Sequence, residues 1–464
     1  MFRMNSKKLM RAFAIIMIVT LIPLAIASAA QRGDNRNTGS SWVNTDGSTT
    51  LFPIIEIAAN QFPAAFPGEN VGYDNGNGNG SGHGRTALIS QVPIASGNGG
   101  PNEPIDVGLS SSPCSTGVTK DEHGVTNANF TEGGLTSNNA AGALTCAQLA
   151  DAQIAKDGIT ILVSQTKVAC IGSVSITSNM IAAIWGGMTY NGEGTTSVPT
   201  PPTEPVGARV QHQWQEFFPG CGTDNIVPVS RISSPTSSGT RSAFLDFNPQ
   251  ITTTDEGLEV TASGVARQTA NADVENLIKN NPSYMGYTGM IFDNSLTAQI
   301  PVALSPGYSA LGGSLVGPKP GVMPTYGNVA NSSYPFSRPL HYYYKAGTSK
   351  QATVDLANFL LSAAGQGNIK KQGFVAAFDA SPALTQPSGV TMSAPAPDWD
   401  VNADHSANVL DVTGIGSFFG QTAPASGDPS YPNVRGWVRG DVNFDAQVNV
   451  LDITTFGPNF GHTW

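Results

Sequence analysis

The amino-acid sequence predicts an α/β protein, because segments typical of strands alternate with segments typical of helices along most of its length. Short apolar and β-branched runs indicate strands, and apolar residues three or four positions apart indicate helices. The expected strands are 105–109, 159–164, 226–229, 284–290 and 340–345. The expected helices are 54–62, 86–90, 179–185, 241–247, 272–279 and 353–364. Such alternation is typical of parallel sheets covered by helices.

Length and composition limit the classes of function. The chain has 464 residues, enough for about two to four domains. Its formal net charge is −10, and only 12% of its residues are charged. This acidic balance argues against a nucleic-acid partner and offers no basic face to anionic lipid. A bound anion would therefore have to be held by local donors.

Residues 1–30 are predicted to be an export signal peptide. Basic residues at positions 3, 7, 8 and 11 precede an apolar run over 12–26, and Ala27-Ser28-Ala29 supplies a small-residue cleavage site. The alternative is an uncleaved membrane anchor, for which the run is short. We expect a mature protein that is secreted, extracellular or held at a cell surface.

The four cysteines show no C-x-x-C spacing, so a zinc site is not expected. In an oxidising compartment they allow up to two disulfides, with three pairings that the sequence does not rank. They are Cys114, Cys146, Cys170 and Cys221.

Three loops rich in hydroxyls and glycine each precede a predicted helix. They are Gly47-Ser-Thr-Thr-Leu-Phe-Pro, Gly78-Asn-Gly-Ser-Gly-His-Gly and Ser238-Gly-Thr-Arg. The first N–H groups of a helix lack intrahelical partners and lie at the positive end of its dipole, so such loops favour a tetrahedral oxyanion. Plainer readings are an ordinary helix N-cap for the third loop and a disordered surface loop for the second. The recurrence of the pattern favours an anion site.

These loops, together with Asp106-Val-Gly-Leu-Ser-Ser, resemble the anion-contacting loops of phosphate-binding proteins that serve ABC importers. Other segments similar to that family follow in its order: Lys156-Asp-Gly-Ile-Thr-Ile-Leu-Val, Ile184-Trp-Gly-Gly, Met285-Gly-Tyr-Thr-Gly and Tyr334-Pro-Phe-Ser-Arg-Pro-Leu. The resemblance implies a two-lobed periplasmic-binding-protein-like fold that binds phosphate or a similar oxyanion in an interlobe cleft. Lobe 1 would comprise 31–157 and 334–380, and lobe 2 would comprise 158–333.

The resemblance also implies which residues bind the anion. They are Ser48, Thr49, Thr50, Leu51, Ser81, Ser111, Arg231, Ser238, Gly239 and Thr240. Two positions depart from the family pattern. Arg231 lies farther from Ser238 than is usual, and Arg241 is its substitute. Ser111 stands where some members have an aspartate that accepts the proton of hydrogen phosphate, and Asp46 is the alternative acceptor.

After residue 380 the composition changes. Residues 381–397 are rich in Pro, Ser and Ala and are predicted to be a linker. The 12-residue segment that begins at Asp400 then recurs from Asp441, at an offset of 441 − 400 = 41. Its oxygen-bearing side chains have the spacing of an EF-hand loop, which predicts two Ca²⁺ sites. The expected ligands are Asp400, Asn402, Asp404, Ser406, Asn408 and Asp411, and Asp441, Asn443, Asp445, Gln447, Asn449 and Asp452.

Two such loops, each followed by one helix, resemble a dockerin, the module that docks on a cohesin domain. The resemblance implies a small α-helical EF-hand-like module over 398–464 and a cohesin-bearing partner. His405 and Ala446 replace the usual turn glycine, which should weaken Ca²⁺ binding. The apolar pairs Val409-Leu410 and Val450-Leu451 form either the docking face or part of the core.

Two main function classes follow. The first is a secreted or cell-surface oxyanion-binding protein that a calcium module attaches to a partner and that serves an ABC importer. The second is a phosphate-ester hydrolase, for which the sequence lacks a carboxylate-rich metal cluster outside the duplicated loops and an evident general base. A structural surface protein with a degenerate cleft is a third alternative. We predict the binding protein, and no enzymatic activity.

Overall fold

The structure is a computed structural model. It describes residues 39–48, 50–73, 80–90, 105–114, 131–132, 135–136, 144–194, 202–203, 210–231, 238–248, 251, 266–268, 271–290, 297–308, 317–348, 350–397, 399–401, 406–417, 419–420, 442 and 447–463. The predicted signal peptide lies outside these residues. None of the described helices is long and apolar enough to cross a membrane.

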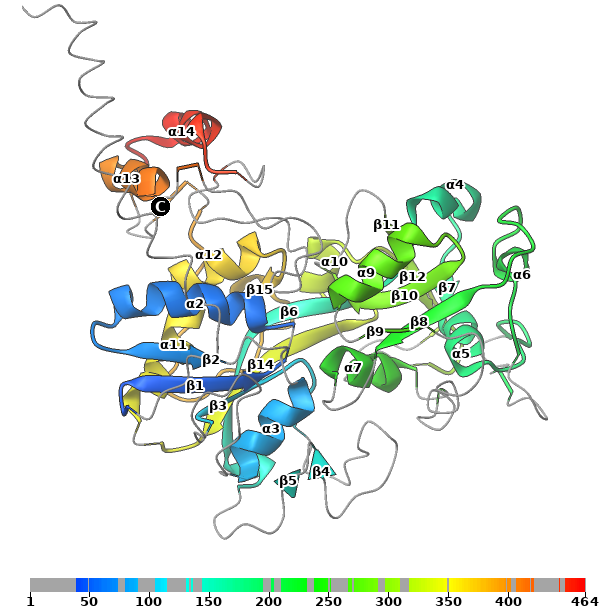
Figure 1. The fold of residues 1–464 in the computed structure, drawn as a ribbon, viewed down its shortest axis with the longest axis horizontal. Helices are drawn as coiled ribbons and strands as arrows, with labels where there is room; N and C mark the ends of the chain where they lie inside the picture. The colour runs from blue at the N-terminus through cyan, green and yellow to red at the C-terminus, as the bar shows by residue number, and fades with distance from the viewer. Residues whose placement is uncertain are drawn as a thin grey trace, which may run out of the picture.

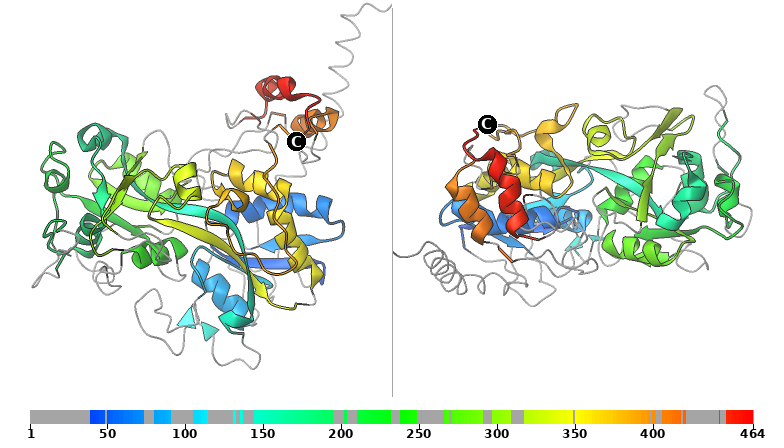
Figure 2. Two further views of the ribbon diagram at one scale, coloured as in Figure 1. Left: turned by 180° about the vertical axis from the view of Figure 1, so that it is seen from behind. Right: turned by 90° about the horizontal axis from the view of Figure 1, so that it is seen from above.

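Two lobes stand side by side and share one strand, β6 (Leu149–Ser164), as Figure 1 and Figure 2 show. The main sheet has the strand order β2-β1-β3-β14-β6-β10-β8-β9, and β11 and β15 also pair with β6. The first part of β6, up to Gly158, pairs with β14, and its last part, from Ile159, pairs with β10. Strand β6 therefore runs from one lobe into the other.

In the described part of lobe 1, strands and helices surround the first part of β6 and the short β15 (Val375–Ala376). The strands are β1 (Trp42–Gly47), β2 (Asn70–Tyr73), β3 (Val107–Ser110) and β14 (Ser337–Lys345). The helices are α2 (Phe52–Ala65), α3 (Ser81–Ser90), α11 (Gln351–Leu361) and α12 (Ala363–Lys371). A short hairpin, β4 (Thr131–Glu132) and β5 (Leu135–Thr136), lies near α3.

Lobe 2 surrounds the second part of β6. Its strands are β7 (Ile176–Thr177), β8 (Val227–Arg231), β9 (Ala266–Gln268), β10 (Tyr284–Gly289), β11 (Thr297–Ile300), β12 (Val302–Leu304) and β13 (Lys319–Val322). Its helices are α4 (Val168–Ile171), α5 (Ser178–Gly186), α6 (Trp214–Phe217), α7 (Gly239–Phe247), α9 (Asn271–Asn280) and α10 (Tyr326–Ala330). Each lobe has its own apolar core, centred on Phe62 and Leu356 in lobe 1 and on Trp185 and Phe244 in lobe 2.

The predicted α/β class is confirmed, but the sheet is mixed rather than parallel. Some strands within a lobe run parallel, as β1 does with β2 and β3, and β8 with β9 and β10, whereas β12 and β13 of lobe 2 pair antiparallel. The strands at the junction pair antiparallel, as β14 does with β3 and β6, and β10 with β6. The reason is topological: β6 carries the chain out of lobe 1, and β14 brings it back.

Three predicted elements have different bounds. The strand 159–164 is only the second half of β6, whose first half is partly exposed and interrupted by polar residues. The helix 353–364 is divided at Ser362, where that side chain caps α12. Helix α3 begins at Ser81, so residues 81–84 are helical rather than loop. A β-carbon at Gly84 would lie 2.5 Å from the carbonyl oxygen of Asp46, so glycine lets α3 approach β1 closely.

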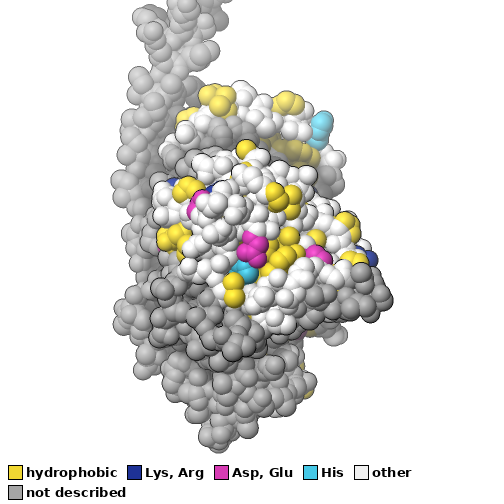
Figure 3. Space-filling view, turned by 90° about the vertical axis from the view of Figure 1, so that its right-hand side faces the viewer, with side chains coloured by type: hydrophobic (Ala, Val, Ile, Leu, Met, Phe, Trp, Pro, Cys, Tyr) yellow, Lys and Arg dark blue, Asp and Glu magenta, His cyan; other side chains and the backbone are white. Residues whose placement is uncertain are grey.

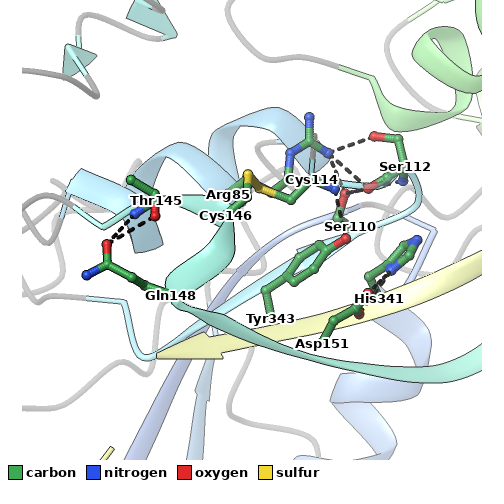
Figure 4. Close-up of a disulfide and its surroundings, with 10 residues drawn as sticks. All are labelled: Arg85, Ser110, Ser112, Cys114, Thr145, Cys146, Gln148, Asp151, His341 and Tyr343. Carbon is green, nitrogen blue, oxygen red and sulfur yellow. Dashed lines mark hydrogen bonds and ion pairs between the residues drawn. A yellow bond between two sulfur atoms is a disulfide. The ribbon is translucent and has the colours of Figure 1, made fainter. Parts of the chain in front are cut away.

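Both predicted disulfides are formed, in one of the three pairings: Cys114–Cys146 and Cys170–Cys221. The first joins the end of the segment after β3 to the start of β6 (Figure 4). It thereby ties the serines that follow β3 to the strand shared by the lobes.

Residues 381–397 connect the lobes to the C-terminal module, and they are held against lobe 1 by hydrogen bonds and apolar contacts. The N–H of Gln153 donates to the carbonyl of Thr385 at 3.3 Å, and the N–H of Ala396 donates to the carbonyl of Ala363 at 2.9 Å. Leu384 and Met392 pack against the lobe 1 core. We call this stretch the strap. The Pro, Ser and Ala content predicts a linker, but not the surface of lobe 1 that holds it.

The C-terminal module is a pair of short helices, α13 (Val409–Ser417) and α14 (Val450–Phe456), which lie beside lobe 1 in all three ribbon views. Its apolar core is small and consists of Ala407, Ile415, Val442, Val448 and Phe456. From the sequence, one helix is expected after each duplicated loop, over the apolar segments 412–419 and 453–460. Both helices begin three residues earlier, because the apolar pair at positions 10 and 11 of each loop is already helical.

The face of the molecule at the end of lobe 2 is largely uncharged. Among the described residues in Figure 3, hydrophobic, acidic and histidine side chains are scattered between uncharged polar atoms, without a gathered basic patch. This agrees with the low content of charged residues in the chain.

Candidate functional site

The N-termini of three helices, α2, α3 and α7, meet at the contact between the lobes. Thr50, just before α2, has its Oγ1 3.4 Å from the Oγ1 of Thr240 in the first turn of α7. Ser81, the first residue of α3, has its Oγ 3.1 Å from the Oγ of Ser111, which follows β3. Gly239 lies against this serine pair, since a β-carbon there would be 2.0 Å from Ser81 Oγ and 2.4 Å from Ser111 Oγ. Hydroxyls of lobe 1 and the start of α7 therefore face one another directly.

These hydroxyls are almost completely buried, with exposed fractions of 0–6% for the described serines and threonines of the predicted set. Local backbone bonds fix two of them. Ser238 is the N-cap of α7, and its Oγ accepts the N–H of Arg241 at 3.2 Å. Ser48 Oγ accepts the N–H of Thr50 at 3.3 Å, and its own N–H donates to Leu109 at 3.0 Å. Because the first N–H groups of a helix lack intrahelical partners, three helix N-termini at the junction make the site rich in donors.

The structure brings together Ser48, Thr50, Ser81, Ser111, Ser238, Gly239 and Thr240. Thr49 lies outside the described residues. Arg231 is the last residue of β8, and its side chain lies outside the described part. Leu51 stands just before α2: its N–H donates to the carbonyl of Ser48 at 3.1 Å, and its side chain belongs to the lobe 1 core. Its predicted role as an anion ligand stays a prediction.

Arg338, on β14, is a site residue that sequence reasoning missed. It is completely buried and forms an ion pair of 2.8 Å with Asp157 of β6. The antiparallel register places these two residues directly opposite each other, which is why the pair forms. Burial raises the pKa of the Asp157 carboxyl, while the guanidinium of Arg338 acts to lower it.

The same guanidinium touches the anion loops of both lobes. Its Nη1 donates to the carbonyl oxygens of Ser111 at 3.2 Å and Gly239 at 3.0 Å, and its Nη2 donates to Thr240 Oγ1 at 3.2 Å. Asp157 and Arg338 stand inside two of the segments on which the family resemblance rests. The sequence signal for this ion pair was one acidic and one basic residue just before two predicted strands. The pairing of the two residues can be recognised only when the register of the strands is known.

Arg85, on α3, is a second missed residue. Its Nη1 donates to Ser110 Oγ at 2.5 Å and to Ser112 Oγ at 2.7 Å, as Figure 4 shows. In the same figure the N–H of Cys114 donates to the hydroxyl of Tyr343 at 2.8 Å. The serine segment after β3 is thus held from both ends, by an arginine and by a disulfide-bonded cysteine.

The two duplicated loops of the C-terminal module close in the same way. Asp411, at position 12 of the first loop, is buried and accepts the N–H groups of Val401 at 2.7 Å and Asn408 at 2.8 Å. Asp452 accepts the corresponding N–H groups of Val442 and Asn449, both at 2.7 Å. The described candidate ligands are Asp400, Ser406, Asn408, Asp411, Gln447, Asn449 and Asp452. Asn402, Asp404, Asp441, Asn443 and Asp445 lie outside the described residues, as do His405 and Ala446. By residue type, the candidate ligands of both loops are oxygen donors, the kind that a hard cation such as Ca²⁺ prefers. Among the described residues, no three carboxylate, imidazole or thiolate groups lie together as at a metal site.

The apolar pairs at the start of α13 and α14 lie at the surface. Val409 and Leu410 are 64% and 57% exposed, and Val450 and Leu451 are 59% and 52% exposed. Of the two alternatives, core and docking face, the core is excluded. The duplicated sequence thus presents the same apolar pair twice on a small module.

The chain was compared with known proteins. Residues 27–364 match a PBP superfamily domain. Phosphate-binding protein PstS 2 of Streptococcus agalactiae serotype V is 28% identical over 162 residues, which cover 34% of this chain and 50% of that relative. The chain thus spans about half the length of the curated relatives it matches.

Two solved structures are similar in fold. An ABC-type phosphate transport receptor from Vibrio cholerae has a TM-score of 0.45 at 16% identity, with coverage of 72% of this chain and 99% of that one. A putative phosphate ABC transporter substrate-binding protein with bound phosphate, from Clostridium perfringens, has a TM-score of 0.46 at 18% identity, with the same coverage. The curated relative is named as a binding protein. Because the matched domain spans most of the sequence and both lobes, the chain belongs to the PBP superfamily.

Proposed function

We propose that this protein is an exported phosphate-binding protein that holds the anion between its lobes. The observation that carries the proposal is the meeting of three helix N-termini and their hydroxyls, contributed by both lobes. Buried donors at the positive ends of helices favour a multiply charged oxyanion without a basic surface. The name of the Streptococcus agalactiae relative supports phosphate as that oxyanion.

Replacing Thr240 by Ala tests the site. Thr240 Oγ1 lies between Thr50 Oγ1 and the Arg338 guanidinium, so its loss removes one hydroxyl donor from the junction. A hydrogen bond to a charged group contributes about 1.5–3 kcal/mol, so phosphate should bind about tenfold more weakly or worse. Isothermal titration calorimetry measures the change.

The matched control is Thr353→Ala, which removes a buried helical hydroxyl that has no hydrogen-bond partner, on α11. It should leave phosphate affinity unchanged. Equal affinity of Thr240→Ala and wild type would refute the assignment of this site.

Selectivity should depend on Ser111. A serine hydroxyl can donate to sulfate or accept from hydrogen phosphate, whereas an aspartate only accepts and so repels a fully deprotonated anion. We therefore expect Ser111→Asp to raise the ratio of phosphate to sulfate affinity above that of wild type, measured by calorimetry with each anion. Ser111→Asn, similar in size but able to donate, is the control. If wild type already excludes sulfate by several orders of magnitude, another acceptor such as Asp46 is in place and the proposal for Ser111 is wrong.

We propose further that residues 398–464 form a dockerin-like Ca²⁺ module that attaches the protein to a cohesin-bearing partner. The duplicated loops, the oxygen donors and the two exposed apolar pairs support this role. Export follows from the predicted signal peptide. Delivery of phosphate to an ABC importer is part of the proposal and is supported by the names of the structural relatives. Pull-down of the full chain with cohesin domains, with and without Ca²⁺, tests the attachment.

A further inference from the structure

We infer that Arg338 is a positioning residue that latches the two lobes together and orients their anion donors. The inference deepens the proposed phosphate site and rests on it. Arg338 stands on the strand that returns to lobe 1, at the crossing point, and its partner Asp157 stands opposite on the strand shared by the lobes. From there the guanidinium reaches Ser111 of lobe 1 and both Gly239 and Thr240 of lobe 2.

All five N–H groups of the guanidinium have an acceptor. Nε donates to Asp157 Oδ2 at 3.2 Å, and Nη2 donates to the same oxygen at 2.8 Å and to Thr240 Oγ1. Nη1 donates to the Ser111 and Gly239 carbonyls. No donor remains for a ligand, so Arg338 does not bind the anion itself. Its contribution is to the geometry of the residues that do.

The bonds to Ser111 and Gly239 connect opposite lobes through one rigid planar group. Separating the lobes breaks at least one of them and leaves a buried N–H of a charged group without an acceptor, which is unfavourable. Arg338 thus stabilises the closed arrangement and should slow release of a bound anion.

The bond to Thr240 sets the direction of a proton. Because Thr240 Oγ1 accepts from Nη2, its own hydrogen points away from Arg338, toward Thr50 Oγ1 or a ligand. The threonine is thereby kept as a donor. Lysine at this position would keep the charge opposite Asp157 but lose the planar fork that reaches both lobes.

The test uses the full chain carrying Arg338→Lys, with Arg338→Met/Asp157→Leu as a second variant. The double variant removes both charges together, a change that buried pairs often tolerate, so it keeps the test available if the lysine variant fails to fold. Thermal melting and circular dichroism establish folding. For each folded variant we expect about tenfold weaker phosphate binding, through faster dissociation with a nearly unchanged association rate, measured by stopped flow. Small-angle scattering in saturating phosphate should show a larger radius of gyration than wild type.

The inference would be overturned if both variants released phosphate at the wild-type rate and had the wild-type radius of gyration. It would also be overturned if phosphate bound more slowly to the variants while its dissociation rate was unchanged. Its failure can be told apart from failure of the proposed function. If the wild-type protein binds no phosphate, the proposed function is wrong, but small-angle scattering without phosphate still tests whether Arg338 holds the lobes together. In that case the variants should have a larger radius of gyration than wild type, and equal radii would reject the inference.

Discussion

Replacement of Gly239 by Ala is expected to weaken phosphate binding by about 10- to 100-fold while leaving the protein folded. The added β-carbon would lie 2.0 Å from Ser81 Oγ and 2.4 Å from Ser111 Oγ, distances that atoms in real structures do not show. Gly239 begins α7, where alanine is a favourable residue, so the isolated lobe has no reason to unfold. Rotation of the serine side chains would not remove the whole collision, because the added β-carbon would still lie 2.7 Å from Ser81 Cβ, so we expect the lobes to move apart. Overpacking of this kind costs about 1–3 kcal/mol, which sets the expected loss of affinity.

Gly327→Ala is the matched control. It also introduces a methyl group near the start of a short helix, α10, but its β-carbon would meet nothing within 4 Å. Calorimetry should find wild-type affinity for this control. Small-angle scattering is performed at a phosphate concentration that reduces the radius of gyration of wild type. At this concentration the radius should stay large for Gly239→Ala and should decrease for Gly327→Ala. A Gly239→Ala protein that binds phosphate as tightly as wild type would show that the lobes do not need this contact.

Removal of Ca²⁺ is expected to unfold residues 398–464 and leave both lobes intact. Among the described residues of the module, five buried apolar side chains with four partly buried ones packed on them form a small core, which is marginal for folding by burial alone. The sequence of each loop also carries aspartates at positions 1, 5 and 12, and of these Asp400, Asp411 and Asp452 are buried. Bound Ca²⁺ would offset their repulsion and couple metal binding to folding. Affinity in the micromolar range or weaker is expected, because the turn glycine is replaced in both loops.

Limited proteolysis of the full chain with mass spectrometry measures this effect. In chelator, cleavage should appear within 398–464, and Ca²⁺ should suppress it. The variant Asp411→Asn/Asp452→Asn should be cleaved in both conditions. Phosphate affinity should be the same with Ca²⁺ and with chelator, because the module contributes no described residue to the anion site. Equal protection of wild type in both conditions would contradict the Ca²⁺ assignment.

Much of the fold could be predicted from local patterns, and the errors have physical causes. The helices 179–185 and 272–279 and the strand 284–290 carry strong periodicity and are confirmed within a residue or two as α5, α9 and β10. Helix α3 was placed too late because its glycines suggest a loop. Gly84 serves close packing against β1, a tertiary requirement that propensity does not reveal.

The candidate site was predicted where hydroxyls and glycines cluster along the chain. Ser48, Thr50, Ser81, Ser111, Ser238, Gly239 and Thr240 do come together in the structure. Arg338 and Arg85 were missed because each acts on residues more than twenty positions away along the chain. A lone arginine in a strand or helix gives no local sign of its partners, and only strand register reveals that Arg338 faces Asp157.

The strap gives the two lobes different mechanical roles. From Thr385 to Ala396 its backbone is bonded to Gln153, Leu361 and Ala363, all in lobe 1, before the chain enters the C-terminal module. A force applied at the module would therefore be transmitted to lobe 1 and not to lobe 2, which carries α7. In the attachment that we propose, lobe 1 would be the fixed lobe and lobe 2 the lobe that moves. A protein anchored in this way could close on its ligand without working against the anchor, even when a surface or a flow pulls on it.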